Sequence, residues 1–290
     1  MLFTPSSLIL RSYSKINASL RVLSLREDGY HELEMVFLPL ELHDVIEISR
    51  FPNSPDTFIT CDDIGLANQR QNLCMKAIDA MRKEFGFKEQ FNVHIHKEIP
   101  YAAGLGGGSS NAATVMQGLV KILNIKTDIA TLKRIALGLG ADVPYFFSCQ
   151  SAKVTGIGDK VEPFYMNKSY YILLVKPKSG LKTTDVYKIC DKFHNDAPLL
   201  TTPLIKALQD GDEKGIVANM ANDLYAPANS LLPEVGKIIA LLHASGFPIA
   251  SMTGSGSACF AMSQNAKAIK DAAKIFEKKG YTVIVTKTLN

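Results

Sequence analysis

Polar and apolar residues alternate along several short stretches of the chain, and in other stretches the apolar residues recur every three or four positions. Alternation sends successive side chains to opposite faces of a strand, whereas the longer period is typical of a helix with one buried face. Strands are therefore predicted over residues 11–25, 32–42, 45–49, 57–61, 91–96, 151–155, 170–175, 250–253, 258–262 and 282–287. Helices are predicted over residues 72–85, 112–123, 127–139, 183–187, 231–243 and 266–279, and residues 191–212 are expected to form a loop with short helices.

This mixture of strands and helices, with hairpins in the first half, indicates an α+β fold in two lobes. The pattern changes beyond Phe147, and we place the boundary between the lobes at residues 150–165. The expected division is 1–158 for the first lobe and 159–290 for the second.

The first predicted strand has one apolar face and one polar face. Its apolar side chains run from Ile16 to Val22, whereas Lys15 and Asn17 lie next to each other on the polar face. A lysine on an isolated strand is usually solvated. The strand pattern therefore does not decide whether Lys15 and Asn17 form a solvated face or have a functional role.

A tight turn follows this strand. Asp28-Gly29 is a strong signal for a hairpin turn, and it places Tyr30 and His31 where the chain leaves the turn. Packing of the turn is the plainer interpretation of this pair. The functional alternative is an aromatic ring for stacking beside a hydrogen-bonding imidazole, which suits a nucleobase or a sugar.

The most informative stretch is PYAAGLGGGSSNAA, residues 100–113. Four glycines and two serines stand between a predicted strand and a predicted helix. Glycine permits a positive φ and a close approach of the backbone to a ligand, and a helix N-terminus attracts phosphate. We interpret the stretch as a cradle for a polyphosphate, with a flexible glycine turn as the alternative.

Two better-known phosphate loops do not fit this stretch. The pattern GxxxxGK[ST] requires a lysine after the last glycine, where this chain has Ser109. The pattern GxGxxG fails because Ser109 also occupies the place of its third glycine.

Other polar residues near this loop have open roles. Lys97 stands just before it and could reach a phosphate. His94 and His96 share a strand face, but no third metal ligand is close in sequence, so we expect an exposed face without metal. Asp142 stands shortly before Pro144, and a helix N-cap and a catalytic role are equally open for it.

Composition and charge exclude several classes of protein. The chain has 290 residues, of which 47% are hydrophobic and 21% charged, as in a globular soluble protein. No apolar run reaches the roughly 18 residues of a membrane span, and no basic region precedes the apolar patch at the start, so we expect neither a membrane partner nor a signal peptide. A net charge of +4 with scattered basic residues argues against a nucleic-acid partner.

The five cysteines are far apart and odd in number. Their spacing fits neither a zinc site nor a disulfide framework, so we expect reduced thiols in a cytoplasmic protein.

Three motifs together resemble those of the GHMP kinases, the family of galacto-, homoserine, mevalonate and phosphomevalonate kinases. Residues 100–110 resemble the ATP loop, the strand around Lys15 resembles the first motif, and Met252-Thr-Gly-Ser-Gly-Ser-Ala-Cys resembles the third. Their order and spacing fit over nearly the whole chain. The Asp-Gly-Tyr-His turn further resembles that of members whose substrate carries a cytidine diphosphate group.

The resemblance implies an ATP-dependent kinase for a small molecule with that group, in a two-lobed α+β fold with the active site between the lobes. It implies that Asp142 is the catalytic base and Lys15 its partner. ATP and Mg2+ are the implied cofactors, with Ser109 or Ser110 near the metal. A monomer or a homodimer is expected.

The resemblance also implies two sets of binding residues. Those for the nucleotide are Asn72, Lys97, Pro100, Tyr101, Ala102, Ala103, Gly104, Leu105, Gly106, Gly107, Gly108, Ser109 and Ser110. Those for the substrate are Asn17, Tyr30, His31, Phe37, Thr183 and Tyr187.

The chain departs from the family pattern in three places. Residues 101–103 stand where glycines are common, Ser257 stands where glycine or proline is usual, and residues 11–14 replace small residues and proline. We expect these departures to change loop geometry without touching a residue with a chemical role.

Two other functions remain open from the sequence. The first is a kinase of this family for another alcohol, such as a mevalonate or homoserine type of acceptor. The second is a nucleotide-binding regulatory module, against which the presence of both Lys15 and Asp142 argues.

Overall fold

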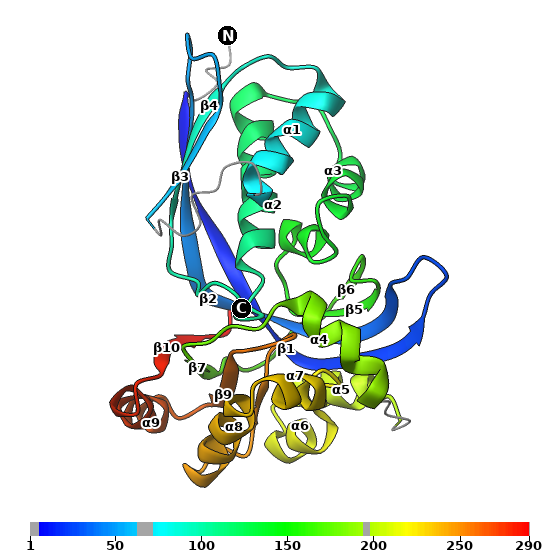
Figure 1. The fold of residues 1–290 in the computed structure, drawn as a ribbon, viewed down its shortest axis with the longest axis vertical. Coiled ribbons are helices and arrows are strands. Elements are labelled where there is room, and N and C mark those ends of the chain that lie inside the picture. Colours follow the sequence, from blue (N-terminus) through cyan, green and yellow to red (C-terminus); the bar gives the residue numbers. More distant parts are fainter. Residues whose placement is uncertain (1–5, 63–71, 194–197, 290) are drawn as a thin grey trace. The chain divides into compact units, whose positions relative to one another are not determined.

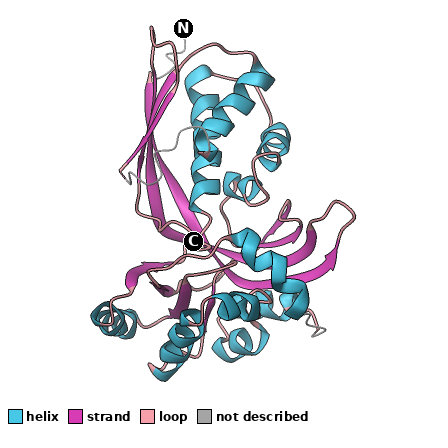
Figure 2. Ribbon diagram, viewed as in Figure 1, coloured by secondary structure: helices cyan, strands magenta, loops and turns pink. Residues whose placement is uncertain are grey.

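The computed structural model describes residues 6–62, 72–193 and 198–289. Helices and strands are mixed along the chain, as predicted (Figure 1, Figure 2). The strands are β1 Ser7–Leu25, β2 His31–Arg50, β3 Phe58–Cys61, β4 Phe91–His96, β5 Ala152–Gly156, β6 Lys160–Pro163, β7 Tyr171–Lys176, β8 Ala250–Met252, β9 Cys259–Ser263 and β10 Thr282–Lys287. The helices are α1 Leu73–Phe85, α2 Gly107–Leu123, α3 Ile129–Leu137, η2 Val143–Phe147, α4 Thr183–Cys190, η3 Asp191–Phe193, α5 Thr201–Asp210, α6 Glu213–Asn219, α7 Tyr225–Leu231, α8 Glu234–Ala244 and α9 Ala266–Lys278.

The chain forms two compact units, each assembled from separate segments. The first unit comprises Met1–Ser14, Leu42–Pro100 and Gly106–Cys149, and the second comprises Lys15–Glu41, Tyr101–Leu105 and Gln150–Asn290. The long strands β1 and β2 contribute residues to both units. The predicted division at residue 158 would split the chain into two continuous segments, whereas each of these units is assembled from three. That division stays a prediction.

The first unit is a sheet covered by helices. The C-terminal part of β2 pairs with β4 in antiparallel fashion, and β3 runs parallel to β4. Helix α1 packs against α2, and α3 and η2 pack there as well, on one side of this sheet (Figure 1). Helix α2 is buried on most sides because the sheet and the other helices surround it.

The second unit contains two sets of antiparallel strands. The N-terminal part of β2 pairs with β5, and β5 pairs with β6. A separate sheet has the order β10-β7-β9-β8, and α8 and α9 pack against its strands. The apolar residues of β7 and β9 are buried beneath these helices and form the centre of the core.

Most predicted elements are present, and the differences have local causes. Residues 45–49 were expected as a separate strand but belong to β2, because the polar residue Asp44 that interrupts the pattern is buried and hydrogen-bonded rather than in a turn. Helix α8 begins after Pro233, three residues later than expected. The edge strand β6 and the short helices α6 and α7 carry too few periodic apolar residues to be predicted.

The described residues contain all five cysteines, and none of these forms a disulfide, as expected. No helix in the described ranges combines the length and the hydrophobicity that a membrane span requires.

A backbone contact in the second unit depends on Gly104. This residue has φ +73°, and a Cβ atom there would overlap the carbonyl oxygen of Thr253. The Thr253 hydroxyl donates a hydrogen bond to the Gly104 carbonyl at 3.2 Å, and Lys15 N–H donates to the Leu105 carbonyl at 3.0 Å. The loop segment Tyr101–Leu105 is therefore held against two distant parts of the chain by its backbone.

This contact gives a prediction for Gly104→Ala, with Gly280→Ala as the matched control. Both glycines have a positive φ, but the space around Gly280 is open. Gly280→Ala should lower the free energy of unfolding by about 1 kcal/mol, through backbone strain alone. Gly104→Ala should lower it by about 3 kcal/mol or more, because the overlap with Thr253 is added to that strain. Equal losses in urea unfolding of the two variants would contradict the contact.

Candidate active site

Lys15 is buried, contrary to the solvated face that its strand pattern suggested. Its side chain lies in the second unit with only 3% of the residue exposed, and Asn17 is 2% exposed. Lys15 Nζ donates a hydrogen bond to Asn17 Oδ1 at 2.6 Å and lies 4.6 Å from the centre of the Phe37 ring. A buried charge is unfavourable unless it is compensated, and the amide oxygen and the aromatic face both do so.

Asn17 connects this ammonium group to the third motif. Its backbone N–H donates to Thr253 Oγ1 at 3.0 Å, and the same hydroxyl contacts the Gly104 carbonyl. Lys15, Asn17, Thr253 and Gly104 thus form one hydrogen-bonded chain. The first motif, the third motif and the first glycine of the loop are brought together by it.

The N-terminus of α2 lies in the first unit and has the features of an anion site. Gly106 precedes the helix in a left-handed conformation, with φ 72°, and the first internal hydrogen bond runs from Ser110 N–H to the Gly106 carbonyl at 2.9 Å. The N–H groups of Gly107, Gly108 and Ser109 therefore have no acceptor within the helix. No acidic residue occupies the first turn, so its positive potential is available to a phosphate.

The two serines of this turn differ in accessibility. Ser109 is half-buried, whereas Ser110 is 2% exposed and lies beside Ser12, with 2.8 Å between the two hydroxyl oxygens. The Ser12 oxygen also lies 2.7 Å from Asn111 Oδ1. Ser12 belongs to the stretch that departs from the family pattern, and its contacts hold the start of α2.

Lys97 reaches the same helix end but has a protein partner. Its ammonium forms an ion pair with Asp44 at 2.6 Å, and a Cβ atom added to Gly107 would lie 3.4 Å from Lys97 Nζ. Asp44 is fully buried and also accepts the N–H groups of Glu98 and Ile99 at 2.8 Å each. Sequence reasoning missed Asp44, because nothing near it in sequence marks these partners.

Asn72 makes a capping hydrogen bond, whereas Asp142 does not. Asn72 caps α1, since its side-chain oxygen accepts the N–H of Cys74 at 2.9 Å. Asp142 stands at the N-cap position of η2, but its carboxylate makes no capping hydrogen bond there. Asp142 therefore does not cap η2 through its side chain, and its catalytic role stays a prediction.

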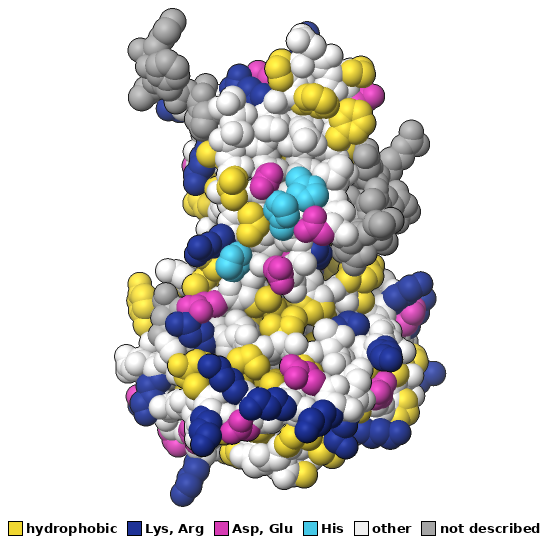
Figure 3. All heavy atoms as spheres, turned by 90° about the vertical axis from the view of Figure 1, so that its left-hand side faces the viewer, with side chains coloured by type: hydrophobic (Ala, Val, Ile, Leu, Met, Phe, Trp, Pro, Cys, Tyr) yellow, Lys and Arg dark blue, Asp and Glu magenta, His cyan; other side chains and the backbone are white. Residues whose placement is uncertain are grey.

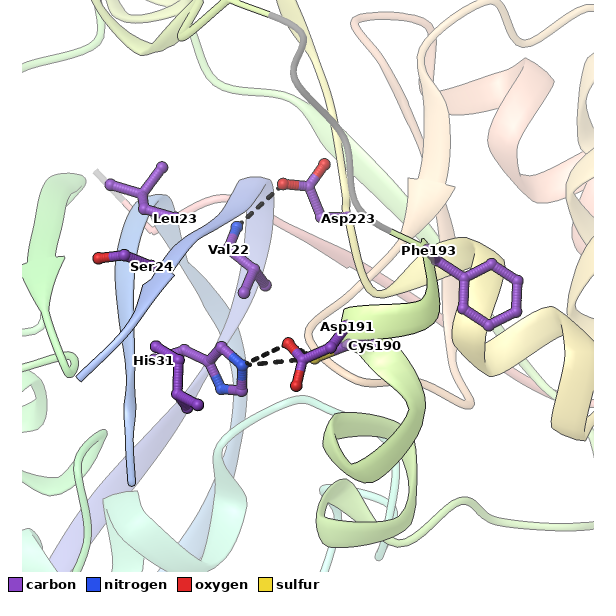
Figure 4. A pocket seen from close by; sticks show the side chains of 9 residues that line it. Val22, Leu23, Ser24, His31, Cys190, Asp191, Phe193 and Asp223 are labelled. Carbon is purple, nitrogen blue, oxygen red and sulfur yellow. Dashed lines mark hydrogen bonds and ion pairs between the residues drawn. The ribbon is translucent and has the colours of Figure 1, made fainter. Parts of the chain in front are cut away.

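His31 is held by a residue that the sequence did not indicate. His31 Nε2 lies 2.9 Å from Asp191 Oδ1, at the end of α4 (Figure 4). The His31 ring centre lies 5.6 Å from that of Tyr187. Tyr30, at the end of the turn, is 59% exposed. An exposed ring beside an oriented imidazole fits a site for a planar, hydrogen-bonding ligand.

A pocket of about 300 Å³ lies beside His31 in the second unit (Figure 4). Its other lining residues are Val22, Leu23, Ser24, Leu25, Cys190, Asp191, Phe193 and Asp223. Asp223 pairs with Arg21 at 2.9 Å, and burial raises the pKa of Cys190 to about 11, so that thiol stays neutral. Of the predicted substrate residues, His31 alone lines this pocket.

The remaining predicted substrate residues lie at other places in the second unit. Asn17 and Phe37 surround Lys15, and Thr183 Oγ1 lies 2.9 Å from Ser255 Oγ of the third motif. The structure therefore gathers these residues around Lys15, around His31 and at the start of α4, rather than in one pocket.

The departures from the family pattern have local structural consequences. Ala102 has φ 51°, a conformation that glycine adopts more readily, and Tyr101 is 68% exposed. Ser257 is fully buried, and its hydroxyl donates to the Ser179 carbonyl at 2.9 Å.

Comparison with known proteins identifies the family. Residues 72–150 match the GHMP kinases N terminal domain, and residues 204–282 match the GHMP kinases C terminal domain. A protein of Chlorobium limicola named 4-diphosphocytidyl-2-C-methyl-D-erythritol kinase is 35% identical, with 96% of each chain covered. A protein of the same name from Thermodesulfovibrio yellowstonii is also 35% identical, covering 97% of this chain and 98% of its own.

Solved structures agree with this assignment. The crystal structure of a 4-(cytidine 5'-diphospho)-2C-methyl-D-erythritol kinase superposes with a TM-score of 0.81 at 28% identity, covering 98% of this chain and all of the other. A homoserine kinase from Cytophaga hutchinsonii shares the fold, with a TM-score of 0.76 at 15% identity and coverage of 100% and 96%. The α+β fold with the three motifs, together with these similarities, shows that the chain belongs to the GHMP kinase family.

Proposed function

We propose that this chain transfers the γ-phosphoryl group of ATP to the 2-hydroxyl of 4-diphosphocytidyl-2-C-methyl-D-erythritol, a step in non-mevalonate isoprenoid precursor biosynthesis. The observation that carries the proposal is the similarity over nearly the full length to kinases named for that substrate. The exposed Tyr30 beside His31, which Asp191 orients, supports a cytosine site.

The ATP phosphates bind at the N-terminus of α2. Phosphoryl transfer depends on positioning and on stabilisation of charge more than on covalent chemistry. The N–H groups of Gly107, Gly108 and Ser109 supply the hydrogen bonds, and Lys97 supplies positive charge at the same helix end. Because Asp44 fixes Lys97, this charge is positioned before the nucleotide arrives.

Asp142 accepts the proton of the substrate hydroxyl as the general base. Lys15 offsets the negative charge of the transferring group. Its burial supports this role, because an ammonium group with little water around it interacts strongly with an anion.

Mg2+ is expected with the nucleotide. Hydroxyl oxygens are hard ligands of the kind that this ion prefers, and Ser109 or Ser110 would supply one, the half-buried Ser109 being the more accessible. When bound, the ion neutralises charge on the phosphates. We expect the enzyme to act in the cytoplasm as a monomer or a homodimer.

A coupled assay of ADP release tests the proposed function. The chain is supplied with Mg-ATP and, in parallel, with 4-diphosphocytidyl-2-C-methyl-D-erythritol, mevalonate or homoserine as acceptor. Turnover with the first acceptor alone is expected. Faster turnover with mevalonate or homoserine would assign the chain to another alcohol, and ATP binding without turnover on any acceptor would favour a regulatory module.

Asp142→Asn should lower kcat by about 10²–10⁴-fold and leave both KM values nearly unchanged, because the amide binds similarly but accepts no proton. The matched control is Asp128→Asn. Asp128 caps α3 through Thr131 N–H, and asparagine caps equally well, so this variant should keep wild-type kcat. Near-normal turnover of Asp142→Asn in the same assay would remove it as the base.

His31→Ala should raise KM for the cytidyl substrate about ten-fold, equivalent to the loss of about 1.4 kcal/mol of binding. KM for ATP should not change. Asp191→Ala should shift the same KM in the same direction, since Asp191 orients the imidazole. A joint rise of both KM values in steady-state kinetics would instead assign His31 a structural role.

A further inference from the structure

A cluster of imidazole and carboxylate groups lies on the solvent face of the sheet in the first unit, on residues to which the proposed reaction assigns no role. His94 and His96 project from β4, and the register places His94 opposite Glu47 of β2 and Thr60 of β3. Figure 3, which views the molecule from this side, shows histidine and acidic side chains grouped together. No third ligand is close in sequence, but strand pairing places Asp62, which follows β3, beside both imidazoles.

The ring nitrogens of this cluster fall into two sets. One nitrogen of each ring has a partner on a neighbouring strand: His94 Nδ1 lies 2.7 Å from Thr60 Oγ1, and His96 Nε2 lies 3.1 Å from Glu47 Oε1. The other nitrogen of each ring faces Asp62. His94 Nε2 lies 2.9 Å from Asp62 Oδ1, and His96 Nδ1 lies 3.3 Å from Asp62 Oδ2.

This division is what a metal site with imidazole ligands requires. A ligating histidine usually donates its second N–H to a carboxylate or another oxygen, which fixes the tautomer and the ring orientation. Glu47 stands in that position for His96, and Thr60 does so for His94. The two rings are also close, with centres 4.4 Å apart and planes at 75°.

The distances fit an ion of the zinc class. Zn–N bonds of about 2.0–2.1 Å in tetrahedral geometry separate neighbouring ligand atoms by about 3.3 Å. The candidate ligand atoms of Asp62, His94 and His96 all lie within 4.8 Å of one another. The two contacts of Asp62 with the imidazoles, at 2.9 and 3.3 Å, already match this separation, and the half-exposed side chains would close the remaining gap by moving at most about 1.5 Å.

We propose that Asp62, His94 and His96 bind a divalent transition-metal ion, with Zn2+ as the best-matched species and water in the fourth position. Two imidazoles and one carboxylate favour zinc over magnesium, so this site does not compete for the metal of the nucleotide. The bound ion joins the end of β3 to β4 and thereby stabilises the sheet. It takes no part in phosphoryl transfer.

Isothermal titration of the full chain with ZnCl2, in the presence of excess Mg2+, tests the site. Wild type should bind one equivalent more than the double variant His94→Ala/His96→Ala. Zinc should also raise the unfolding temperature of wild type and not that of the double variant. The Mg-ATP kinase activity of the double variant should match wild type, which shows that its fold is intact.

Two further variants distinguish this site from zinc binding elsewhere on the chain. Glu47→Gln should weaken zinc binding by about 10–100-fold without abolishing it, since Glu47 orients a ligand. His31→Ala/Cys190→Ser alters a second group of potential ligands, which comprises His31, Cys190 and Asp191. This variant should still bind the one equivalent of zinc that we assign to Asp62, His94 and His96. No zinc binding by wild type, or equal stoichiometry in wild type and His94→Ala/His96→Ala, would overturn the proposal.

Discussion

The burial of one positive charge, the ammonium group of Lys15, constrains much of the second unit. Only 3% of this residue is exposed, so the charge must be compensated by neighbouring groups. Asn17 accepts its hydrogen bond and Phe37 presents a ring face, while Asn17 in turn is held by Thr253. Thr253 contacts the backbone of Gly104, where no side chain fits. Segments far apart in sequence are thus held together around one charge, which we assign to the reaction.

The first unit contains a second buried charge of opposite sign. The fully buried carboxylate of Asp44 accepts hydrogen bonds from Lys97 and from the backbone of residues 98 and 99. These bonds fix the chain just before the glycine loop and place the Lys97 ammonium at the N-terminus of α2. A buried ion pair is weak evidence for stability, because desolvation offsets much of the attraction. The ion pair instead positions the Lys97 ammonium at the N-terminus of α2, which is suited to bind phosphate.

The features that depend on local backbone physics could be predicted from the sequence. The glycine-rich turn and the turn at Gly29 follow from conformational preferences that act within a few residues. The start of α2 was not predicted, because it begins at Gly107, five residues before the expected start at residue 112. The partners of the functional side chains could not be predicted in this way. Asp44, Asp62 and Asp191 meet their partners only through strand pairing or tertiary packing. The burial of Lys15 was missed for the same reason, because tertiary packing covers the polar face of β1 that alternation alone leaves open.

The burial of Lys15 serves its charge and not the packing of the second unit. Steady-state kinetics and thermal unfolding of Lys15→Met test this claim together, since methionine keeps an apolar chain against Phe37 and removes the ammonium. The expected result is a fall in kcat of about 10²–10³-fold with an unfolding temperature at or above that of wild type. A kcat close to that of wild type would contradict the account.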